Sequence, residues 1–418
     1  MKRISLTGVL LLFLGASQVW ATDLPTLQEQ ALNNRELVKR YELVVEKSGQ
    51  DLQMARGGYY PSLDIGYRMT ALDEASIFEA AEHSAAYASI TWNLYAGFRD
   101  RYGIAAAELM SEAEKLRLQG VHQDIRLRVA LRYLDVYERQ EALQVAKDTL
   151  TTLSRVYQDG KNRLQVGLVS ENDLLKIKVD LGGAEITLAK AEADLAKAVL
   201  LLDRESGVSL AVADLDFTVF DQLPDLDETV HNEEEVLARR SDLLLLRDLV
   251  EAAAFRVKTE EAGRYPQVNL TTTYQTAEDH FLLGQGDGSE EELRTQLVLS
   301  MNLFDGYVRG AKVNKAGLDH RSIRYELAEL EKDLVTEFSN LLRDFSVAQA
   351  NITVARTTIE QARENLRVTR LKYGEGLEQE ADVLTAVSGL SNARANYVGV
   401  VRLLFANYYQ ILRAVEQI

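Results

Sequence analysis

The two halves of this chain repeat the same short motifs in the same order, and this repetition constrains the fold more than any other feature. The repeated pairs are Tyr60-Pro61 with Tyr265-Pro266, NLYAGF at 93–98 with NLFDGY at 302–307, and Gly167 and Asp173 with Gly376 and Asp382. The offset between the members of a pair stays between 205 and 209 residues. We therefore expect a tandem duplication, with a first structural repeat at 22–223 and a second at 224–418, which together form one protomer.

Each repeat carries two predicted strands, at about 61–70 and 85–96 in the first repeat and at about 266–276 and 293–304 in the second. A proline pushes the residue before it out of the helical region and is tolerated where a strand begins, so each Tyr-Pro pair predicts a switch from helix to strand. Apolar residues then occupy every second position: Leu63, Ile65, Tyr67 and Met69 in the first strand, and Ala88, Ile90, Trp92 and Leu94 in the next.

A strand with one apolar face suits either a sheet that packs on a protein core or the wall of a membrane barrel. Most of the other apolar residues lie in narrow helical seams, which leaves few for a soluble core under the sheet and favours lipid as the partner. Bacterial membrane barrels begin at about eight strands. Four strands from one chain therefore require several chains to close one barrel.

The helical segments carry heptad seams. Over residues 323–373 apolar residues recur at alternating steps of four and three, with one stutter at Phe338. This spacing predicts a coiled-coil-like helix at 310–372, and the segment 387–415 has a seam of its own. Each repeat is thus predicted as helix, strand, strand, long helix, helix. Taken alone, the seams indicate long paired helices and no particular function.

The N-terminus predicts export. Lys2 and Arg3 precede an apolar run that is too short for a membrane-spanning helix, and small residues around Ala21 predict a signal peptide at 1–21. The chain has no cysteine, which excludes disulfides, thiolate metal sites and a lipid anchor on an N-terminal cysteine. Removal of the two basic residues leaves a net charge of −19, which argues against nucleic acid as a partner.

The sequence contains no catalytic constellation. The five histidines are scattered without metal-ligand spacing, and there is no HExxH, GxSxG or phosphate-loop motif. The segment GQGDG at 284–288 lies between two predicted strands, so a surface hairpin loop explains it better than a phosphate-binding loop. We therefore predict that the protein is not an enzyme and uses no cofactor or metal.

Taken together, these features resemble the TolC-like outer-membrane efflux proteins. The resemblance covers essentially the whole mature chain and rests on the signal peptide, the duplication, the Tyr-Pro strand starts, the NL(Y/F)xG strand ends, and the segments GLVSEND at 167–173 and GLEQEAD at 376–382. It implies a mainly α-helical protein with a membrane β-barrel portion. Three chains would form one twelve-stranded barrel in the outer membrane, continued through the periplasm by a coiled-coil tunnel.

The resemblance also implies a function and partners. The homotrimer would be a passive exit duct that works with an inner-membrane transporter and a periplasmic adaptor, also called a membrane fusion protein, in efflux or type I secretion. The sequence does not distinguish whether the exported cargo is a drug, a metabolite, a metal or a polypeptide. A periplasmic coiled-coil scaffold without channel activity is the alternative, and it would fractionate with soluble periplasm instead of with the outer membrane.

The resemblance further places a gate at the turns 163–172 and 372–381. Asp173 and Tyr373 match residues that link neighbouring tip helices in the family, and Asp382 matches part of a constricting acidic ring. Glu378 replaces a linking arginine and Thr385 a second ring aspartate, which puts the latch and the ion selectivity in question. Both aspartates also fit a simple helix-capping role, and Tyr373 also fits a last seam residue.

Two further groups of residues follow from the resemblance. The tip residues expected to contact the adaptor are Arg163, Gly167, Leu168, Val169, Lys372, Gly376 and Leu377. The two glycines also fit an ordinary helix-ending role. The aromatic residues expected at the membrane interface are Trp92, Tyr95, Phe98, Phe304 and Tyr307.

Overall fold

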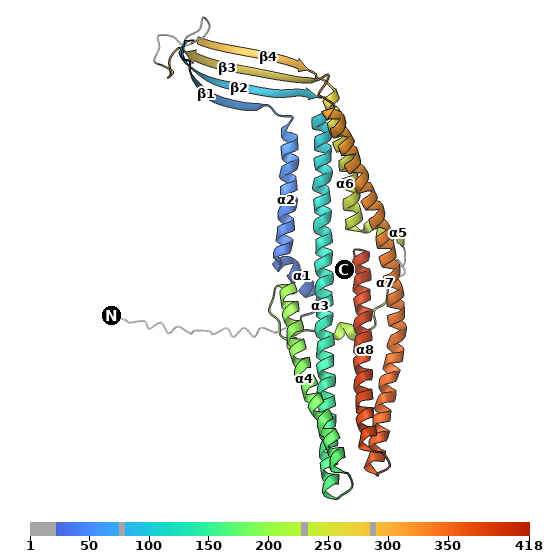
Figure 1. The fold of residues 1–418 in the computed structure, drawn as a ribbon. Helices are drawn as coiled ribbons and strands as arrows, with labels where there is room; N and C mark the ends of the chain where they lie inside the picture. Colours follow the sequence, from blue (N-terminus) through green and yellow to red (C-terminus); the bar gives the residue numbers. More distant parts are fainter. Residues whose placement is uncertain (1–21, 75–79, 227–232, 285–289) are drawn as a thin grey trace, which may run out of the picture. The chain divides into compact units, whose positions relative to one another are not determined.

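The computed structural model describes residues 22–74, 80–226, 233–284 and 290–418, which form two compact units (Figure 1). Unit 1 contains the chain up to Arg35 together with Ile125–Leu226 and Arg343–Gln410. Unit 2 contains Glu36–Asp124, Asp227–Leu342 and Ile411–Ile418. The predicted signal peptide, most of the GQGDG segment and His231 lie outside the described residues.

The longer helices have corresponding lengths in the two repeats. They are α1 (Leu24–Asn34), α2 (Glu36–Gly57), α3 (Arg99–Gln165), α4 (Glu171–Ser206), α5 (Glu233–Arg239), α6 (Ser241–Glu261), α7 (Val308–Gly374) and α8 (Glu380–Ala414), with short 3-10 turns at Val212–Asp214, Thr218–Asp221 and Ala262–Arg264. Helices α3 and α7 contain 67 residues each, and α4 and α8 contain 36 and 35. In the described part of the chain, no helix combines the length and the apolar character that crossing a membrane requires.

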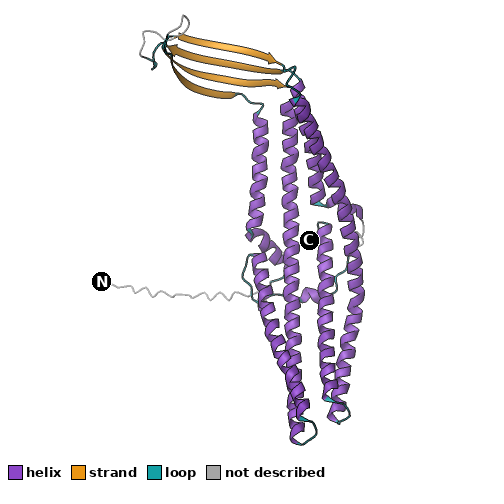
Figure 2. Ribbon diagram, viewed as in Figure 1, coloured by secondary structure: helices purple, strands orange, loops and turns teal. Residues whose placement is uncertain are grey.

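One antiparallel sheet, in unit 2, contains all four strands (Figure 2), and Figure 1 labels their order β1-β2-β3-β4. The strands are β1 (Ser62–Ala71), β2 (Glu82–Ala96), β3 (Gln267–Glu278) and β4 (Glu290–Ser300). Strands β1 and β3 begin directly after the prolines of the two Tyr-Pro pairs. The predicted end of the last strand at 304 is wrong: the ladder stops at the pair Gln267–Ser300, because Pro266 has no N–H to continue it.

The register gives the sheet one apolar and one polar face, because directly paired residues point to the same side. The apolar face contains the rows Ile65–Ala88–Tyr274–Leu293 and Trp92–Leu270–Leu297. The polar face contains the row Asp64–Ser89–Thr273–Arg294. On the apolar face Ile65 is 83% exposed and Leu297 65% exposed within the protomer. This face therefore needs a partner outside the single chain.

A β-bulge changes the alternation near the end of β2. The register shifts between Asn93 and Tyr95, so that Tyr95 pairs with Val268 and Leu94 becomes the extra residue. The sequence predicted Leu94 on the apolar face; the bulge gives that place to Tyr95. The change puts an aromatic ring on the apolar face at the end of the sheet from which α3 begins.

Unit 1 contains a layer of four helical segments in the order α4, α3, α8, α7 (Figure 1). Contacts support each neighbour relation. An added Cβ at Gly160 of α3 would lie 3.0 Å from Ile177 of α4, and Arg394 of α8 bonds Asp148 of α3 at 2.6 Å. Leu366 and Tyr373 of α7 join the buried cluster that includes Val383 and Val387 of α8. Helices α3 and α8 are therefore central, and α4 and α7 form the edges.

We expect the substitution Gly97→Ala to destabilise the protein more than Gly306→Ala, although both glycines have the same backbone conformation. Their φ angles are 67° and 68°, where an L side chain costs about 1–2 kcal/mol. A Cβ at Gly97 would also lie 2.5 Å from the carbonyl oxygen of Ala262, whereas a Cβ at Gly306 meets nothing within 4 Å. Thermal unfolding of the two variants gives the comparison. Equal losses would mean that the packing against Ala262 contributes nothing.

Candidate functional site

Both helix turns of the tip, in unit 1, end in the same backbone motif. Gly167 has φ 75°, and the N–H of Leu168 donates to the carbonyl of Arg163 at 2.9 Å. Gly376 has φ 77°, and the N–H of Leu377 donates to the carbonyl of Lys372 at 2.9 Å. This is the left-handed helix ending that glycine favours, so both glycines do terminate helices.

The next helices begin with capping aspartates. The hydroxyl of Ser170 accepts from the N–H of Asp173 at 3.2 Å, and the N–H of Ser170 donates back to the Asp173 carboxylate at 3.3 Å. In the second turn the N–H of Gln379 donates to the Asp382 carboxylate at 3.0 Å. Asp173 and Asp382 therefore cap α4 and α8. Bonds from the Ser170 hydroxyl and from Lys176 hold the pKa of Asp173 below its usual range, so this carboxylate stays ionised.

Two basic residues of the α3–α4 hairpin contact the α7–α8 hairpin. Arg163 Nη2 donates to the carbonyl oxygen of Gly374 at 2.9 Å, and its guanidinium carbon lies 4.3 Å from the centre of the Tyr373 ring. Lys176 Nζ lies 3.0 Å from Asp173 Oδ1 and 3.6 Å from Glu380 Oε1. These contacts join the two hairpins of the tip inside one protomer.

Tyr373 lies between the hairpins and is 7% exposed. Its ring packs in the cluster with Val383 and Val387, and burial raises the pKa of its phenol, which remains neutral at physiological pH. In the described part of the protomer its hydroxyl has no hydrogen-bond partner. The predicted contact with Asp173 is thus not made within the protomer, where Ser170 and Lys176 take that carboxylate.

The remaining predicted gate residues make local contacts. Lys372 donates to Glu378 at 3.1 Å across the α7–α8 turn, and the hydroxyl of Thr385 donates to the carbonyl of Ala381 at 2.8 Å. The sequence analysis missed Lys176 and Glu380. A signal for Lys176 was present, since it follows Asp173 by one helical turn, but Glu380 comes from a distant part of the chain.

The tip also exposes apolar side chains. Leu168 and Leu377 are 70% and 71% exposed at equivalent positions of the two turns, whereas Val169 is half-buried. Val166, which the sequence analysis did not single out, is equally exposed. Apolar residues at both turns are the kind of surface that a protein partner covers.

The aromatic residues of unit 2 form two similar pairs at one end of the sheet. Tyr95 and Phe98 meet edge to face at 5.3 Å, and Phe304 and Tyr307 at 5.5 Å. Phe98 and Tyr307 share a left-handed backbone, with φ 68° and 70°, so the motifs NLYAGF and NLFDGY fold alike. The indole N–H of Trp92 donates to the carbonyl of Tyr59 at 2.9 Å. Among the described residues, no group of three or more His, Asp or Glu side chains could hold a metal ion.

Comparison with known proteins identifies the family. The model of the outer membrane efflux protein family matches residues 27–208 and again 233–415. The chain belongs to this family. The double match places one copy of the family pattern in each half of the chain.

Relatives and solved structures agree with this assignment. The chain is 21% identical to the outer membrane efflux protein BepC of Brucella suis over 321 residues, which cover 77% of this chain and 69% of BepC. It is 24% identical to the proteases secretion protein PrtF of Dickeya chrysanthemi over 417 residues, 94% of this chain and 87% of PrtF. The fold matches the outer membrane protein VceC of Vibrio cholerae with a TM-score of 0.83 at 16% identity, over 94% and 96% of the two chains.

These findings confirm the predicted fold, location and class of function. The efflux protein is a channel of the outer membrane. Its function is export across that membrane, in the class of systems that includes efflux and secretion. The rival prediction of a scaffold without channel activity is therefore wrong.

Proposed function

We propose that three copies of this chain close one exit duct, which receives cargo from an inner-membrane transporter through a periplasmic adaptor. The number three and the two partners rest on the resemblance to TolC-like proteins. The main support from the structure is that both layers of the protomer have two open edges. The duplicated strands would contribute four strands per copy, and the proposal contains no catalytic step.

The first pair of open edges belongs to the sheet in unit 2. Strands β1 and β4 are the outer strands of the order β1-β2-β3-β4, and each has one partner strand in the described part of the chain. An exposed strand edge presents unpaired N–H and C=O groups, which in lipid must be paired with another strand. Pairing of β1 with β4 of the next copy satisfies both edges and produces a closed ring.

The second pair of open edges belongs to the helical layer in unit 1. Helix α4 carries a seam buried in the protomer, which includes Ile177 and Ala184, and a second apolar seam that is mostly exposed. The members of this second seam are Leu175, Val179, Gly182, Ile186, Ala189, Ala193, Ala196 and Leu200. Their spacing alternates between four and three, as in a coiled coil. A seam of this kind predicts another helix as its partner.

Helix α7 carries a second seam with the same spacing, apolar towards both ends and polar at Thr357, Gln361 and Glu364. Its members are Val347, Ala350, Val354, Thr357, Gln361, Glu364, Val368 and Leu371. Helix α4 begins at the tip and α7 ends there, so in a ring of copies the two edges meet antiparallel. When the members of the two seams are counted in order from the tip, Leu175 pairs with Leu371, Ala193 with Val354, and Leu200 with Val347. Head-to-tail contacts between two different edges are the interfaces that close a ring.

Disulfide trapping tests this arrangement, and the absence of native cysteine makes it simple. We expect the double variant Ala193→Cys/Val354→Cys to form a covalent trimer when membranes are oxidised. Each single variant should remain monomeric on a denaturing gel, because a head-to-tail contact never brings a residue next to its own copy. Covalent dimers from a single variant would instead indicate a two-fold dimer.

A register control uses Ala193→Cys with Val347→Cys. Seven helical residues separate Val347 from Val354, or about 10 Å along the helix, which is too far for a disulfide. This variant should cross-link poorly. Equal cross-linking of the two double variants, or none in either, would contradict the proposed edge contact.

At the tip, we place the resting gate where the two hairpins of each protomer join. Tyr373, Asp173, Asp382, Glu378 and Thr385 line this region, and Arg163 and Lys176 make its cross-hairpin contacts. An adaptor that covers the exposed turn residues Leu168, Leu377 and Val166 could bind the separated hairpins better than the joined ones. It would then favour the open state by that difference in affinity.

The cargo is chosen by the partner transporter in this proposal. The two relatives differ in this respect, since BepC is named for efflux and PrtF for protease secretion. Purification of the protein from its native membrane with a mild cross-linker should recover one adaptor and one transporter. Recovery of the outer-membrane protein alone would count against a role in a three-part system.

A further inference from the structure

We propose that Glu205 and Glu416 form two equivalent locks, one in each repeat, that fasten the end of the last helix to the start of the second helix. Glu416 does this as a helix cap supplied to α6 by the C-terminal segment of the chain. The two copies of the family pattern end at residues 208 and 415, so the two locks lie at corresponding places. This inference does not depend on the number of copies in the assembly.

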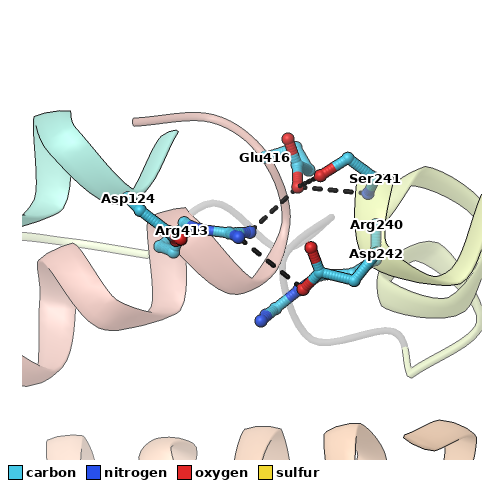
Figure 3. Close-up of polar contacts among 6 residues, drawn as sticks. All are labelled: Asp124, Arg240, Ser241, Asp242, Arg413 and Glu416. Atoms are coloured by element: carbon cyan, nitrogen blue, oxygen red, sulfur yellow. Dashed lines mark hydrogen bonds and ion pairs between the residues drawn. The ribbon is translucent and has the colours of Figure 1, made fainter. Parts of the chain in front are cut away.

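The lock in unit 2 is centred on the carboxylate of Glu416 (Figure 3). Glu416 Oε1 accepts from the backbone N–H of Ser241 at 3.2 Å, from the Ser241 hydroxyl at 2.8 Å and from Arg413 Nη1 at 2.9 Å. The side chains of Glu416 and Arg413 are 4% and 6% exposed. The C-terminal segment and the first turn of α6 are therefore joined by buried, charged hydrogen bonds.

Helix α6 needs such a cap. The first N–H groups of a helix have no partner within the helix, and a carboxylate there also interacts favourably with the helix dipole. The residue before α6 is Arg240, and its side chain makes no capping bond. Ser241 is 1% exposed, so water does not replace the missing cap. The carboxylate of Glu416 takes the place that a serine or aspartate before the helix usually fills.

A guanidinium holds the capping carboxylate in place. Besides Glu416, Arg413 bonds Asp124 of α3 through Nε at 2.7 Å, and its Nη2 lies 3.7 Å from Asp242 Oδ2. Arg240 Nε in turn bonds Asp242 at 3.1 Å. Three carboxylates thus face two guanidinium groups, as Figure 3 shows, and the network joins an inner turn of α3 to the start of α6 and the end of α8.

The backbone of Glu416 supports a specific role for its side chain. Its φ is 59°, and the N–H of Gln417 donates to the carbonyl of Leu412 at 2.8 Å, which is the helix ending that glycine favours. A glutamate there is strained, so the strain must be offset by what the side chain does. Glycine would be the better residue if this position only ended α8.

The corresponding lock in unit 1 divides between two residues what Glu416 does alone: one residue ends the helix and another supplies the carboxylate. Helix α4 ends at Gly207, with φ 73°, where an added Cβ would lie 2.7 Å from the Cβ of Asn34. No side chain fits there, and the carboxylate comes instead from Glu205, two residues earlier. Its side chain is 5% exposed and accepts from Arg35, the residue between α1 and α2. Each repeat therefore ends in a buried carboxylate: Glu416 bonds the first residue of α6, and Glu205 bonds Arg35, the residue before α2.

The substitution Glu416→Gly separates the cap from the backbone ending. It relieves the strain at φ 59° and removes the carboxylate. We expect it to lower the thermal stability of the purified protein and to speed amide exchange at Ser241 and Leu243 by roughly fivefold to tenfold. Gln417→Ala, at the neighbouring position, should leave both unchanged. Unchanged or higher stability with unchanged exchange in Glu416→Gly would overturn the proposal for unit 2.

A milder pair of variants covers the case in which Glu416→Gly fails to fold. Ser241→Ala removes one donor to Glu416 and should produce a smaller loss in stability with faster exchange confined to the start of α6. Glu205→Gln tests unit 1, where we expect a loss of thermal stability that adds to that of Glu416→Gln in the double variant. Unchanged thermal stability of Glu205→Gln would refute the lock proposed for unit 1. Normal amide exchange in Ser241→Ala would refute the lock proposed for unit 2.

Discussion

Replacement of both Arg163 and Lys176 with alanine should raise the single-channel conductance of the assembled protein in planar bilayers. These two side chains are the ones that reach from the α3–α4 hairpin to the α7–α8 hairpin in the described tip, through the carbonyl of Gly374, the ring of Tyr373 and the carboxylate of Glu380. Without them the hairpins of a closed tip can separate. The expected result is a higher conductance, because the open state of the tip is more populated, with unchanged assembly of the protein.

The size of the expected effect follows from the contacts of Arg163. Its cation–π contact contributes about 0.5–1 kcal/mol and its exposed hydrogen bond a similar amount. Three symmetry-related tips would then bias closure by about 3–6 kcal/mol, and about 5.5 kcal/mol shifts a two-state equilibrium from 1:99 to 99:1. For the proposed gate, the contact of Arg163 alone is therefore large enough to control opening.

A matched control comes from the α7–α8 turn. Lys372 and Glu378 form an ion pair at 3.1 Å that stays within one hairpin, so Lys372→Ala/Glu378→Ala should leave the conductance unchanged. Tyr373→Phe tests whether this hydroxyl bonds to a neighbouring copy. Within the described protomer the hydroxyl has no partner, so water or a neighbouring copy is what it can bond to. If the double variant of Arg163 and Lys176 assembles and conducts like the wild type, these contacts are not the latch.

The sequence predicted the elements of the fold because their signals are local. A period of two in the strands, heptad steps in the helices and the two Tyr-Pro switches depend on neighbouring residues alone. The end of β4 and the bulge near Tyr95 could not be predicted in this way. Both depend on the pairing with β3, in which Pro266 stops one ladder and Val268 pairs with Tyr95.

For the residues at the tip, too, local features could be predicted from the sequence and long-range contacts could not. The capping role of Asp173 could be read from Ser170 three residues earlier, whereas the gate at the two turns rests on the resemblance to the family and stays a prediction. The contacts of Arg163 with Tyr373 and of Lys176 with Glu380 join residues about 200 positions apart. No spacing rule connects such residues, so only the packed hairpins reveal which side chains meet.

Leu297→Lys should prevent most of the protein from reaching the outer membrane, whereas Gln296→Lys should not. The two residues are neighbours on β4, and the register places Leu297 in the apolar row with Trp92 and Leu270. A lysine on the lipid face of a barrel costs about 2–4 kcal/mol at the bilayer midplane. In a trimer the cost is incurred three times, so even a value near the lower end would strongly disfavour insertion.

Gln296→Lys introduces the same side chain one position away, in the row of Thr91 and Thr271 on the polar face. In a closed barrel that face lines the water-filled interior, where a lysine stays hydrated. Quantification of both variants in purified outer membranes, with total expression as the reference, measures the difference. Normal levels of Leu297→Lys would mean that the apolar face is covered by protein, and equal losses in both variants would mean that β4 tolerates no lysine on either face. Only unequal levels, with Leu297→Lys the lower, agree with lipid as the partner of the apolar face.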